Sequence, residues 1–415
     1  MSELSHLEKL LGGAEVEWRA LWEVTSWDKK FNAVDKFKQP NIIKYHYFLA
    51  KEIKSLVSAT GDVKLLTTNI SNLYTTESLA GDKISEGEVI AIPWGGNAVV
   101  QYYKGKFLTS DNRIATSNDT KKLKTKYLYY FLLSKVKTIE SFYRGSGIKH
   151  PSMADILDIS IPIPSIEAQS EIVRILDKFT ALTTELTAEL TARKKQHNYY
   201  RDQLLSFEEG ECEWVTLSAV LKEKGYIRGP FGSALKKEFF VESGVPVYEQ
   251  QHAINDKREF RYFITKEKSE SLKRFLTKEN DIIISCSGTI GKTSIISKTD
   301  CNGVINQALL ILRLDHNKVD ARFIRAYLNC YPELITTSSG GAITNIASRD
   351  VIQKIKIPLV PVMKQVILID TLDKFEKMTN SITEGLPREI ELRQKQYEYY
   401  RDLLFRFPKP ESVTN

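Results

Sequence analysis

The chain has 415 residues, of which 42% are hydrophobic and 10% aromatic, and this apolar content argues for packed cores and against a disordered protein. Its formal net charge of +7 is compatible with a polyanionic partner but does not require one. No run reaches the roughly 18 apolar residues of a membrane span. Four widely spaced cysteines favour reduced thiols in a cytoplasmic protein over a metal site.

The first predicted elements return later in the chain, which indicates a duplicated module. EWRALWEV begins at Glu17 and aligns with EWVTLSAV at Glu213, an offset of 196 residues. At the same offset LDKF occurs at Leu176 and at Leu372. Agreement of several landmarks at one offset is improbable by chance, so we interpret the chain as two diverged copies.

The first part of each copy is predicted to be a mixed α/β domain. Short β-rich runs lie at 88–94, 281–287 and 308–314, separated by clusters of Gly, Asn, Asp and Ser. Helices are predicted at 126–136 and 321–330, between the runs.

The last part of each copy is predicted to be a long helix. Apolar residues recur every three or four positions, as in the seam of a coiled coil, from Ile172 to Leu190 and from Leu372 to Phe407. Two similar seams in one chain most simply pack on each other, antiparallel if a pseudo-twofold axis relates the copies. EGLP at 384–387 predicts a kink, or a fresh helix with Pro387 at its first position.

The two helices differ in length. The phrase YYRD begins at Tyr199 and Tyr399, an offset of 200, so four residues separate the copies in this region. Four helical residues span about 6 Å at 1.5 Å per residue, which is nearly two base-pair steps of about 3.4 Å. A helical strut of fixed length that carries two different recognition domains would suit a DNA target made of two separated half-sites. This geometry does not by itself identify DNA as the ligand.

Several phrases resemble the specificity subunits of type I restriction-modification systems, most closely the IC subfamily. They are IPIPSIEAQSEIVRILDKF at 161–179, the tandem TTELTAEL at 183–190, and the segments ending in YYRDQLLSF and YYRDLLFRF. The resemblance implies two target-recognition domains, each reading one half of a split double-stranded DNA sequence. It implies a strut that docks two methyltransferase subunits, to which endonuclease–translocase subunits attach. It also implies a non-catalytic chain without a cofactor, because the methyl donor and ATP belong to the partner subunits.

The expected fold is therefore α/β, with two pseudo-symmetric target-recognition domains joined by two long antiparallel helices. We expect the first target-recognition domain at 1–160 and the central helical spacer at 161–207. The second target-recognition domain is expected at 208–357 and the C-terminal helical spacer at 358–415.

A glycine-rich segment, SGTIGKTS at 287–294, has part of the pattern of a nucleotide-binding loop. Such a loop needs a glycine where Cys286 stands and a helix after it, whereas TSIIS continues as a strand. Two interpretations stay open. One is a hairpin turn with a structural role, and the other is a turn that approaches DNA through Thr289 and Lys292. The first domain has a similar segment, PWGGNA at 93–98.

Signatures of catalysis are missing from the sequence. We find no amino-methyltransferase motif, cofactor loop, zinc-protease motif or nucleophile elbow. His150 and His252 are expected at the surface rather than as ligands. An enzyme in its own right is therefore disfavoured, while a coiled-coil scaffold that binds proteins stays open as the alternative to DNA recognition.

Candidate DNA contacts are side chains that can read base edges or hold phosphates from loops. The set is Lys29, Lys30, Asn97, Asn112, Arg113, Arg144, Lys149, Arg228, Ser233, Gln250, Gln251, Thr289, Lys292, Asn306 and Gln307. We hypothesise that Arg144 and Arg228 lie on the DNA face. For any single member, a solvated surface group is an equally good interpretation.

The repeated YYRD phrases are candidates for binding a partner protein, since aromatic side chains beside charges are typical of interfaces. The residues are Tyr199, Tyr200, Arg201, Tyr399, Tyr400 and Arg401. The alternative is that the two Arg-Asp pairs lock the two long helices to each other.

Overall fold

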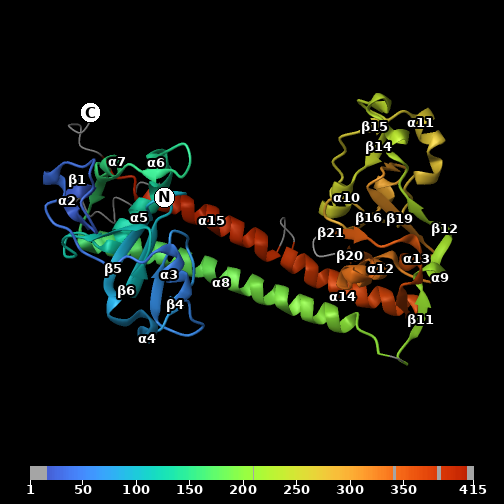
Figure 1. Ribbon diagram of the computed structural model, residues 1–415, viewed down its shortest axis with the longest axis horizontal. Coiled ribbons are helices and arrows are strands. Elements are labelled where there is room, and N and C mark those ends of the chain that lie inside the picture. The colour runs from blue at the N-terminus through green and yellow to red at the C-terminus, as the bar shows by residue number, and fades with distance from the viewer. Residues whose placement is uncertain (1–15, 209, 340–342, 381–384, 409–415) are drawn as a thin grey trace, which may run out of the picture. The chain divides into compact units, whose positions relative to one another are not determined.

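The computed structural model describes residues 16–208, 210–339, 343–380 and 385–408. It divides into two compact units, residues 1–187 with 389–415 and residues 188–388 (Figure 1). Each unit contains one α/β head. The mixed α/β class and the long helices that were predicted are confirmed.

The head of the first unit is built on a six-stranded sheet of order β2-β7-β5-β6-β3-β4. Its strands are β2 (Thr25–Trp27), β3 (Val63–Leu66), β4 (Tyr74–Thr75), β5 (Ser85–Pro93), β6 (Gln101–Thr109) and β7 (Asn112–Ser117). Two short pairs flank it, β1 (Glu17–Ala20) with β10 (Ser160–Ile163) and β8 (Tyr143–Arg144) with β9 (His150–Pro151).

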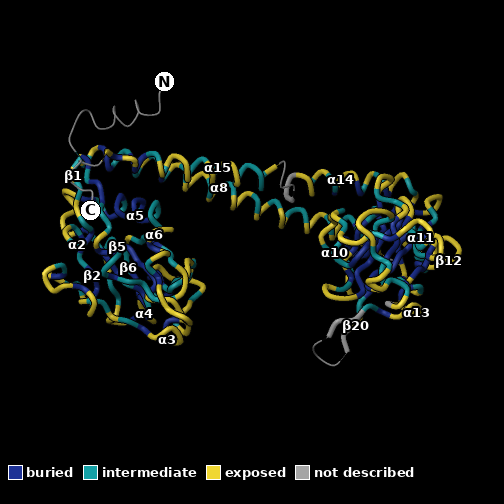
Figure 2. Tube along the Cα trace, turned by 90° about the horizontal axis from the view of Figure 1, so that it is seen from above, coloured by how far each residue is buried: buried dark blue, intermediate teal, exposed yellow. Residues whose placement is uncertain are grey.

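The helices of this head are α2 (Leu21–Val24), α3 (Ala50–Ser55), α4 (Glu77–Ala80), α5 (Thr125–Ser134), α6 (Val136–Ser141) and α7 (Met153–Leu157), with 3-10 turns at Lys36–Lys38 and Gly81–Lys83. Helix α5 is apolar on most sides because it is buried, with Tyr127 and Leu128 fully covered. Figure 2 shows the buried residues of each head gathered around its sheet.

The head of the second unit contains two four-stranded sheets, of order β12-β19-β16-β17 and β13-β15-β14-β18. The strands are β12 (Leu221–Arg228), β13 (Phe240–Val241), β14 (Val245–Tyr248), β15 (Phe263–Ile264), β16 (Ile282–Ser285), β17 (Thr293–Ile295), β18 (Val304–Ile305) and β19 (Leu309–Leu314). Two pairs flank them, β11 (Glu213–Thr216) with β22 (Lys356–Leu359) and β20 (Thr336–Ser339) with β21 (Ile343–Ile346).

The helices of the second head are α9 (Leu217–Val220), α10 (Gln250–Asn255), α11 (Lys266–Ser271), α12 (Ala321–Cys330) and α13 (Arg349–Lys354). Its 3-10 turns lie at Gly232–Leu235, Lys237–Phe239, Lys273–Phe275, Lys298–Asp300 and Pro332–Leu334. The duplication is confirmed at the level of register, because Glu17 pairs with Ile163 in the first unit and Glu213 pairs with Leu359 in the second.

Three long helices follow the heads, α8 (Ile166–Leu204), α14 (Val362–Asn380) and α15 (Gly385–Leu404). The predicted break in the second copy separates α14 from α15, and its residues 381–384 lie outside the described residues. A fresh helix does form, but it begins at Gly385, so Pro387 is its third residue and not its first as expected.

The end of each long helix completes the core of one head. In the first unit, Phe405 lies 5.3 Å from Tyr127 and 5.7 Å from Phe131 between ring centroids. In the second unit, Leu205 is fully buried and Phe207 lies 6.3 Å from Phe323. Since Leu205 and Phe405 hold equivalent places in the repeated phrase, the phrase of one copy packs in the head of the other copy.

The aromatic contact between helices is repeated as well. Phe179 of α8 stacks on Tyr400 of α15 in the first unit, with centroids 5.4 Å apart and planes at 24°. In the second unit Phe375 of α14 stacks on Tyr200 of α8, at 5.8 Å and 25°. Within each unit, therefore, helices from the two copies pack together, as the paired seams predicted.

Candidate nucleic-acid interface

In both heads, one corner of the main sheet collects polar, basic and aromatic side chains. In the first head this corner is formed by the ends of β2 and β5, the start of β7 and the β8–β9 hairpin. The register places Arg113 of β7 opposite Ile92 of β5, and Tyr143 of the hairpin donates to the Pro93 carbonyl oxygen at 2.8 Å. In the second head the corresponding strands are β12, β16 and β19, with the β20–β21 hairpin.

Arg113 lies at the centre of the corner in the first head. Its guanidinium carbon is 5.7 Å from the ring centroid of Phe31 and 5.6 Å from that of Trp94, within the range of cation–π contact. Trp94 follows β5 and is 46% exposed, so its ring is part of the molecular surface. The neighbouring His150 packs on Trp94 with centroids 4.6 Å apart, and its Nδ1 is 2.9 Å from the Trp94 carbonyl oxygen.

Beneath Arg113 lies a buried carboxylate, Asp28, whose exposed fraction is 4%. Tyr47 donates its hydroxyl to one Asp28 oxygen at 2.6 Å, and the Ile114 amide donates to the other at 3.0 Å. Burial raises the pKa of Asp28, while the hydrogen bond from Tyr47 and the charge of Arg113 oppose this rise. Burial lowers the pKa of Arg113, and the negative charge of Asp28 opposes that change.

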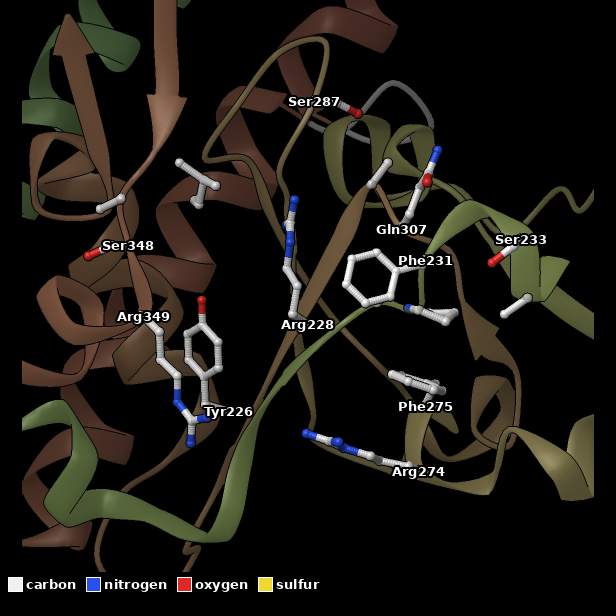
Figure 3. Close-up of a pocket in the computed structure, with 16 residues that line it drawn as sticks. Tyr226, Arg228, Phe231, Ser233, Arg274, Phe275, Ser287, Gln307, Ser348 and Arg349 are labelled. Atoms are coloured by element: carbon white, nitrogen blue, oxygen red, sulfur yellow. The ribbon is translucent and has the colours of Figure 1, made fainter.

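In the second head the corner is an open cavity of about 1020 Å³ (Figure 3). Three arginines line it, Arg228 from β12, Arg274 from a 3-10 turn and Arg349 from the start of α13. Within the described part of the chain, none of the three forms an ion pair with a carboxylate. A cavity with this many uncompensated cations favours a negatively charged ligand.

An aromatic side chain stands at the same cavity. Phe231 is 89% exposed, and Gln307, two residues before β19, is exposed beside it (Figure 3). The loop before Phe231 depends on Gly229, because a Cβ there would lie 1.8 Å from the carbonyl oxygen of Asn306. Only glycine allows this close approach of two backbone segments, which places Arg228 and Phe231 beside Gln307.

Among the other DNA contacts predicted in the first head, most side chains are exposed and one is fully buried. Lys30, Asn97, Arg144 and Lys149 are exposed, and Lys29 is half-buried with its ammonium 5.5 Å from the Tyr47 ring centroid. Arg144 forms an ion pair with Asp155 at 3.0 Å.

The structure corrects the prediction that Asn112 contacts DNA. It is fully buried, and its side-chain amide donates to the Leu66 carbonyl oxygen at 2.9 Å. Its polarity serves the sheet rather than a surface, so we remove it from the set.

The predicted residues of the second head are spread over several loops. Arg228, Ser233, Thr289, Lys292 and Gln307 are exposed, whereas Gln250 and Gln251 are half-buried at the start of α10. Asn306 is half-buried, and its side-chain oxygen already accepts a hydrogen bond from the nearby Ala308 amide at 2.9 Å.

The glycine-rich segment at 287–294 connects β16 and β17 as a hairpin. The Ser285 amide donates to the Lys292 carbonyl oxygen at 2.9 Å, and a strand follows, so the segment is a hairpin turn and not a nucleotide-binding loop, as its sequence indicated. The segment at 93–98 likewise joins β5 to its antiparallel neighbour β6.

His252 was expected at the surface and is instead fully buried. Its ring stacks on Phe260 with centroids 4.7 Å apart, and its two nitrogens lie 3.1 Å from the carbonyl oxygens of Glu249 and Glu259. The histidine is thus a core residue, and burial lowers its pKa.

The four cysteines are free thiols, as expected. Among the described residues, no group of His, Cys, Asp or Glu side chains is arranged to hold a metal ion. A search of the same residues finds no helix with the length and apolar character needed to cross a membrane.

The sequence did not reveal several members of the two corners, namely Phe31, Trp94, Phe231, Arg274 and Arg349. Each is isolated in the sequence, and only the folding of strands, turns and helices around the sheet brings it to the corner. One signal was available, since an aromatic residue between glycines in GPFGS at 229–233 indicates a loop that presents a ring.

The repeated YYRD residues lie on the long helices. Tyr199 and Tyr399 are 58% and 46% exposed. Arg201 pairs with the adjacent Asp202 at 2.6 Å, and Arg401 with Asp402 at 2.8 Å. Each of these ion pairs joins neighbours in one helix rather than two helices, which argues against the interpretation as a lock.

Comparison with known proteins gives a consistent result. A family model described as the type I restriction modification DNA specificity domain matches residues 48–193 and again 228–392. The chain is 38% identical to a type I restriction enzyme specificity subunit of Escherichia coli, with 100% of both chains covered. It is 34% identical to the specificity subunit of the E. coli enzyme EcoprrI, over 54% of this chain and 58% of that protein.

Solved structures share the fold at low sequence identity. The type I restriction-modification S subunit from M. genitalium matches with a TM-score of 0.54 and 18% identity, covering 96% of this chain and 98% of that one. A chain from work on complex assembly and conformational transition of the type I R-M system matches with a TM-score of 0.57 and 16% identity, covering 95% and 98%.

Proposed function

Because the chain belongs to the family of type I restriction-modification DNA specificity subunits, we propose that it directs such a complex to a bipartite target in double-stranded DNA. Residues 1–160 and 208–357 would each read one half-site, and the helical segments 161–207 and 358–415 would set the gap. The observation that supports this most is the corner of the main sheet. It carries arginine beside an exposed aromatic ring in both heads, although the residues come from different strands.

Arginine and aromatic side chains at one edge suit DNA for two reasons. Guanidinium groups bind phosphates and the acceptor atoms of guanine, and exposed rings pack against bases or sugars. The two corners differ in detail, since the first is filled by Phe31, Trp94 and His150 while the second is an open cavity. Different corners would read different sequences, as a target with two unlike halves requires.

The chain would serve as the non-catalytic member of its complex. Two methyltransferase subunits would supply the chemistry and the methyl donor, and endonuclease–translocase subunits would join through them. Two identical partners need equivalent surfaces, and the two copies offer them. In one copy α8 carries the Arg193–Glu189 ion pair at 2.7 Å and, six residues after Arg193, the exposed Tyr199; in the other, α15 carries the Arg393–Glu389 pair at 2.7 Å and Tyr399.

The test is to map modified bases across the source genome with this gene intact and with it deleted. A split motif that disappears on deletion gives both half-sites and the gap together. If every modified motif survives the deletion in cells that express the partner subunits, the proposal fails. The coiled-coil scaffold would then be favoured, and the purified chain with its partners would show no duplex binding that weakens with salt.

A further inference from the structure

We propose that Arg113 of the first head forms hydrogen bonds to a guanine in the major groove. Cation–π contacts with Phe31 and Trp94 would orient its guanidinium for this role. This inference rests on the proposed function and assigns one base contact within it. No hydrogen bond or ion pair joins the Arg113 guanidinium to another residue in the described ranges, and its Nε is buried without a partner.

Hydrogen-bond donors without an acceptor are unusual for a half-buried arginine. The residue is half-buried at the start of a strand, where the backbone is fixed by pairing of Arg113 with Ile92. Leaving buried donors unpaired costs free energy, so such sites usually supply an acceptor from the protein. Here the aromatic contacts to Phe31 and Trp94 stabilise the charge but provide no hydrogen-bond acceptor.

The carboxylate that interacts with Arg113 electrostatically is already occupied. Asp28 accepts from the Tyr47 hydroxyl and from the Ile114 amide, and it forms no ion pair with Arg113 among the described residues. Asp28 therefore offsets part of the free-energy cost of the half-buried positive charge of Arg113. It does so without accepting a hydrogen bond from the N–H groups of the Arg113 guanidinium, the planar donor fork. The arrangement leaves the guanidinium of this partly exposed side chain without a hydrogen-bond acceptor among the described residues.

The ligand must present two acceptors to a planar fork, which within DNA leaves phosphate and guanine. Adenine and cytosine present an amino donor in the major groove, and thymine presents a single acceptor beside a methyl group. A fork fixed by two rings on a paired strand favours guanine, because its N7 and O6 have a defined position in the groove. The exposed ring of Trp94 beside the fork can pack against a neighbouring base or sugar.

Other arginines of this head lack these features. Arg144 is paired with Asp155 at 3.0 Å. Arg19 is bound by Glu17, with its Nε 2.6 Å from a Glu17 oxygen, and interacts with Glu23. Arg19 thus provides a matched control, an arginine of the same head whose donors are already used.

The experiment uses the full chain assembled with its methyltransferase subunits, and compares the wild type with Arg113→Gln, Arg113→Lys and Arg19→Gln. Modified motifs are mapped for each assembly. We expect Arg113→Gln and Arg113→Lys to relax one guanine position in one half-site, while the other half-site and the gap stay unchanged. Arg19→Gln is expected to keep the wild-type motif.

A base substitution then identifies the contact. Duplexes carry 7-deazaguanine, which lacks the N7 acceptor, or hypoxanthine, which keeps N7 and O6, at that guanine. We expect 7-deazaguanine to weaken binding of the wild-type assembly by about ten-fold or more, and hypoxanthine to be tolerated. The Arg113→Gln assembly is expected to bind both duplexes alike.

Each other outcome overturns the assignment. An unchanged motif with Arg113→Gln excludes a role in reading sequence. Weaker binding to all duplexes alike, with a salt slope reduced by about one, identifies a phosphate contact instead. If the variants do not assemble, the wild-type complex tested with 7-deazaguanine at each guanine of the target still decides the matter, since tolerance everywhere excludes the contact. A wild-type assembly without any split motif would instead count against the proposed function.

Discussion

At the scale of single residues, one glutamine in each copy fixes the long helix to its head. In the first unit Gln169 is fully buried, and its side-chain oxygen accepts from the Lys124 amide at 2.9 Å. Its side-chain nitrogen donates to the carbonyl oxygens of Lys122 at 2.7 Å and Pro164 at 2.9 Å. Gln365 repeats this geometry in the second unit, where it accepts from Asp320 and donates to Val360.

Replacing Gln169 by Leu should destabilise the first unit by about 3 kcal/mol, because several buried backbone groups lose their partner at about 1–3 kcal/mol each. Urea denaturation followed by tryptophan fluorescence would measure this, since four of the five tryptophans (Trp18, Trp22, Trp27 and Trp94) belong to that unit. The exposed Glu167→Gln serves as the control. An unchanged midpoint with Gln169→Leu would contradict the bonding role.

A second residue-scale prediction concerns Phe231, whose ring is 89% exposed at the cavity of the second head. Its replacement by Ala should leave folding unchanged, because little of the ring is packed. Duplex affinity of the assembled complex should fall by about five- to a hundred-fold if the ring stacks on DNA, corresponding to about 1–3 kcal/mol. Fluorescence anisotropy with the mapped target would test this, with Val241→Ala as a control. Equal affinities would remove Phe231 from the interface.

At the scale of elements, the repeated phrase YYRD-x-L-x-x-F explains why each copy ends as it does. The segment after α15 supplies Phe405 to the core around Tyr127, and the segment after α8 supplies Leu205 to the core around Phe323. Each head is therefore complete only with the helix end of the other copy. A duplicated sequence satisfies this requirement once for each head.

This exchange predicts a crossed pattern of destabilisation. Phe405→Ala should cost the first head about 3–5 kcal/mol, and Leu205→Ala should cost the second head about 2–5 kcal/mol. Hydrogen exchange read by mass spectrometry should show faster exchange in α5 (Thr125–Ser134) for Phe405→Ala and in α12 (Ala321–Cys330) for Leu205→Ala. If each variant loosened the head of its own copy, the exchange of helix ends would be refuted.

The elements were also the part of the fold that the sequence predicted best. The helix at 321–330 and the strands at 88–94 and 308–314 follow from apolar periodicity and flanking turn residues, and α12, β5 and β19 lie there. The corners were not predictable in full. Phe31, Trp94 and Arg113 come together through the register of β2, β7 and β5, and a one-residue shift in register would turn Arg113 to the other face.

The alternation of side chains along a strand is also why Asn112 was wrongly predicted as a DNA contact. Asn112 and Arg113 are adjacent in β7, so they point to opposite faces of the sheet. Asn112 donates to a backbone carbonyl oxygen in the interior, and Arg113 contacts the aromatic rings at the corner. From the sequence alone the two polar residues were equivalent candidates, because nothing in their neighbours decides which face is buried.

At the scale of the whole molecule, duplication would provide two equivalent surfaces for the two identical partners proposed above. An exposed tyrosine and an Arg-Glu ion pair recur at the same spacing in each copy, Tyr199 with Arg193 and Tyr399 with Arg393. Positions that differ between the copies are poorer candidates, such as Met363, which is 73% exposed where the first copy has Glu167. If a methyltransferase docks twice, as proposed, it must use residues that the two copies share.

Tyr199→Ala should therefore remove one methyltransferase subunit from the complex, and Tyr399→Ala should remove the other, because truncating an aromatic hot spot at the centre of an interface costs about 2 kcal/mol or more. Native mass spectrometry at protein concentrations near the dissociation constant would show a 1:1 complex for each single variant and a free specificity subunit for the double variant. Met363→Ala should keep two subunits. If neither tyrosine variant changes the stoichiometry, docking must use other shared positions along the helices, and the ion pairs at Arg193 and Arg393 become the next to substitute.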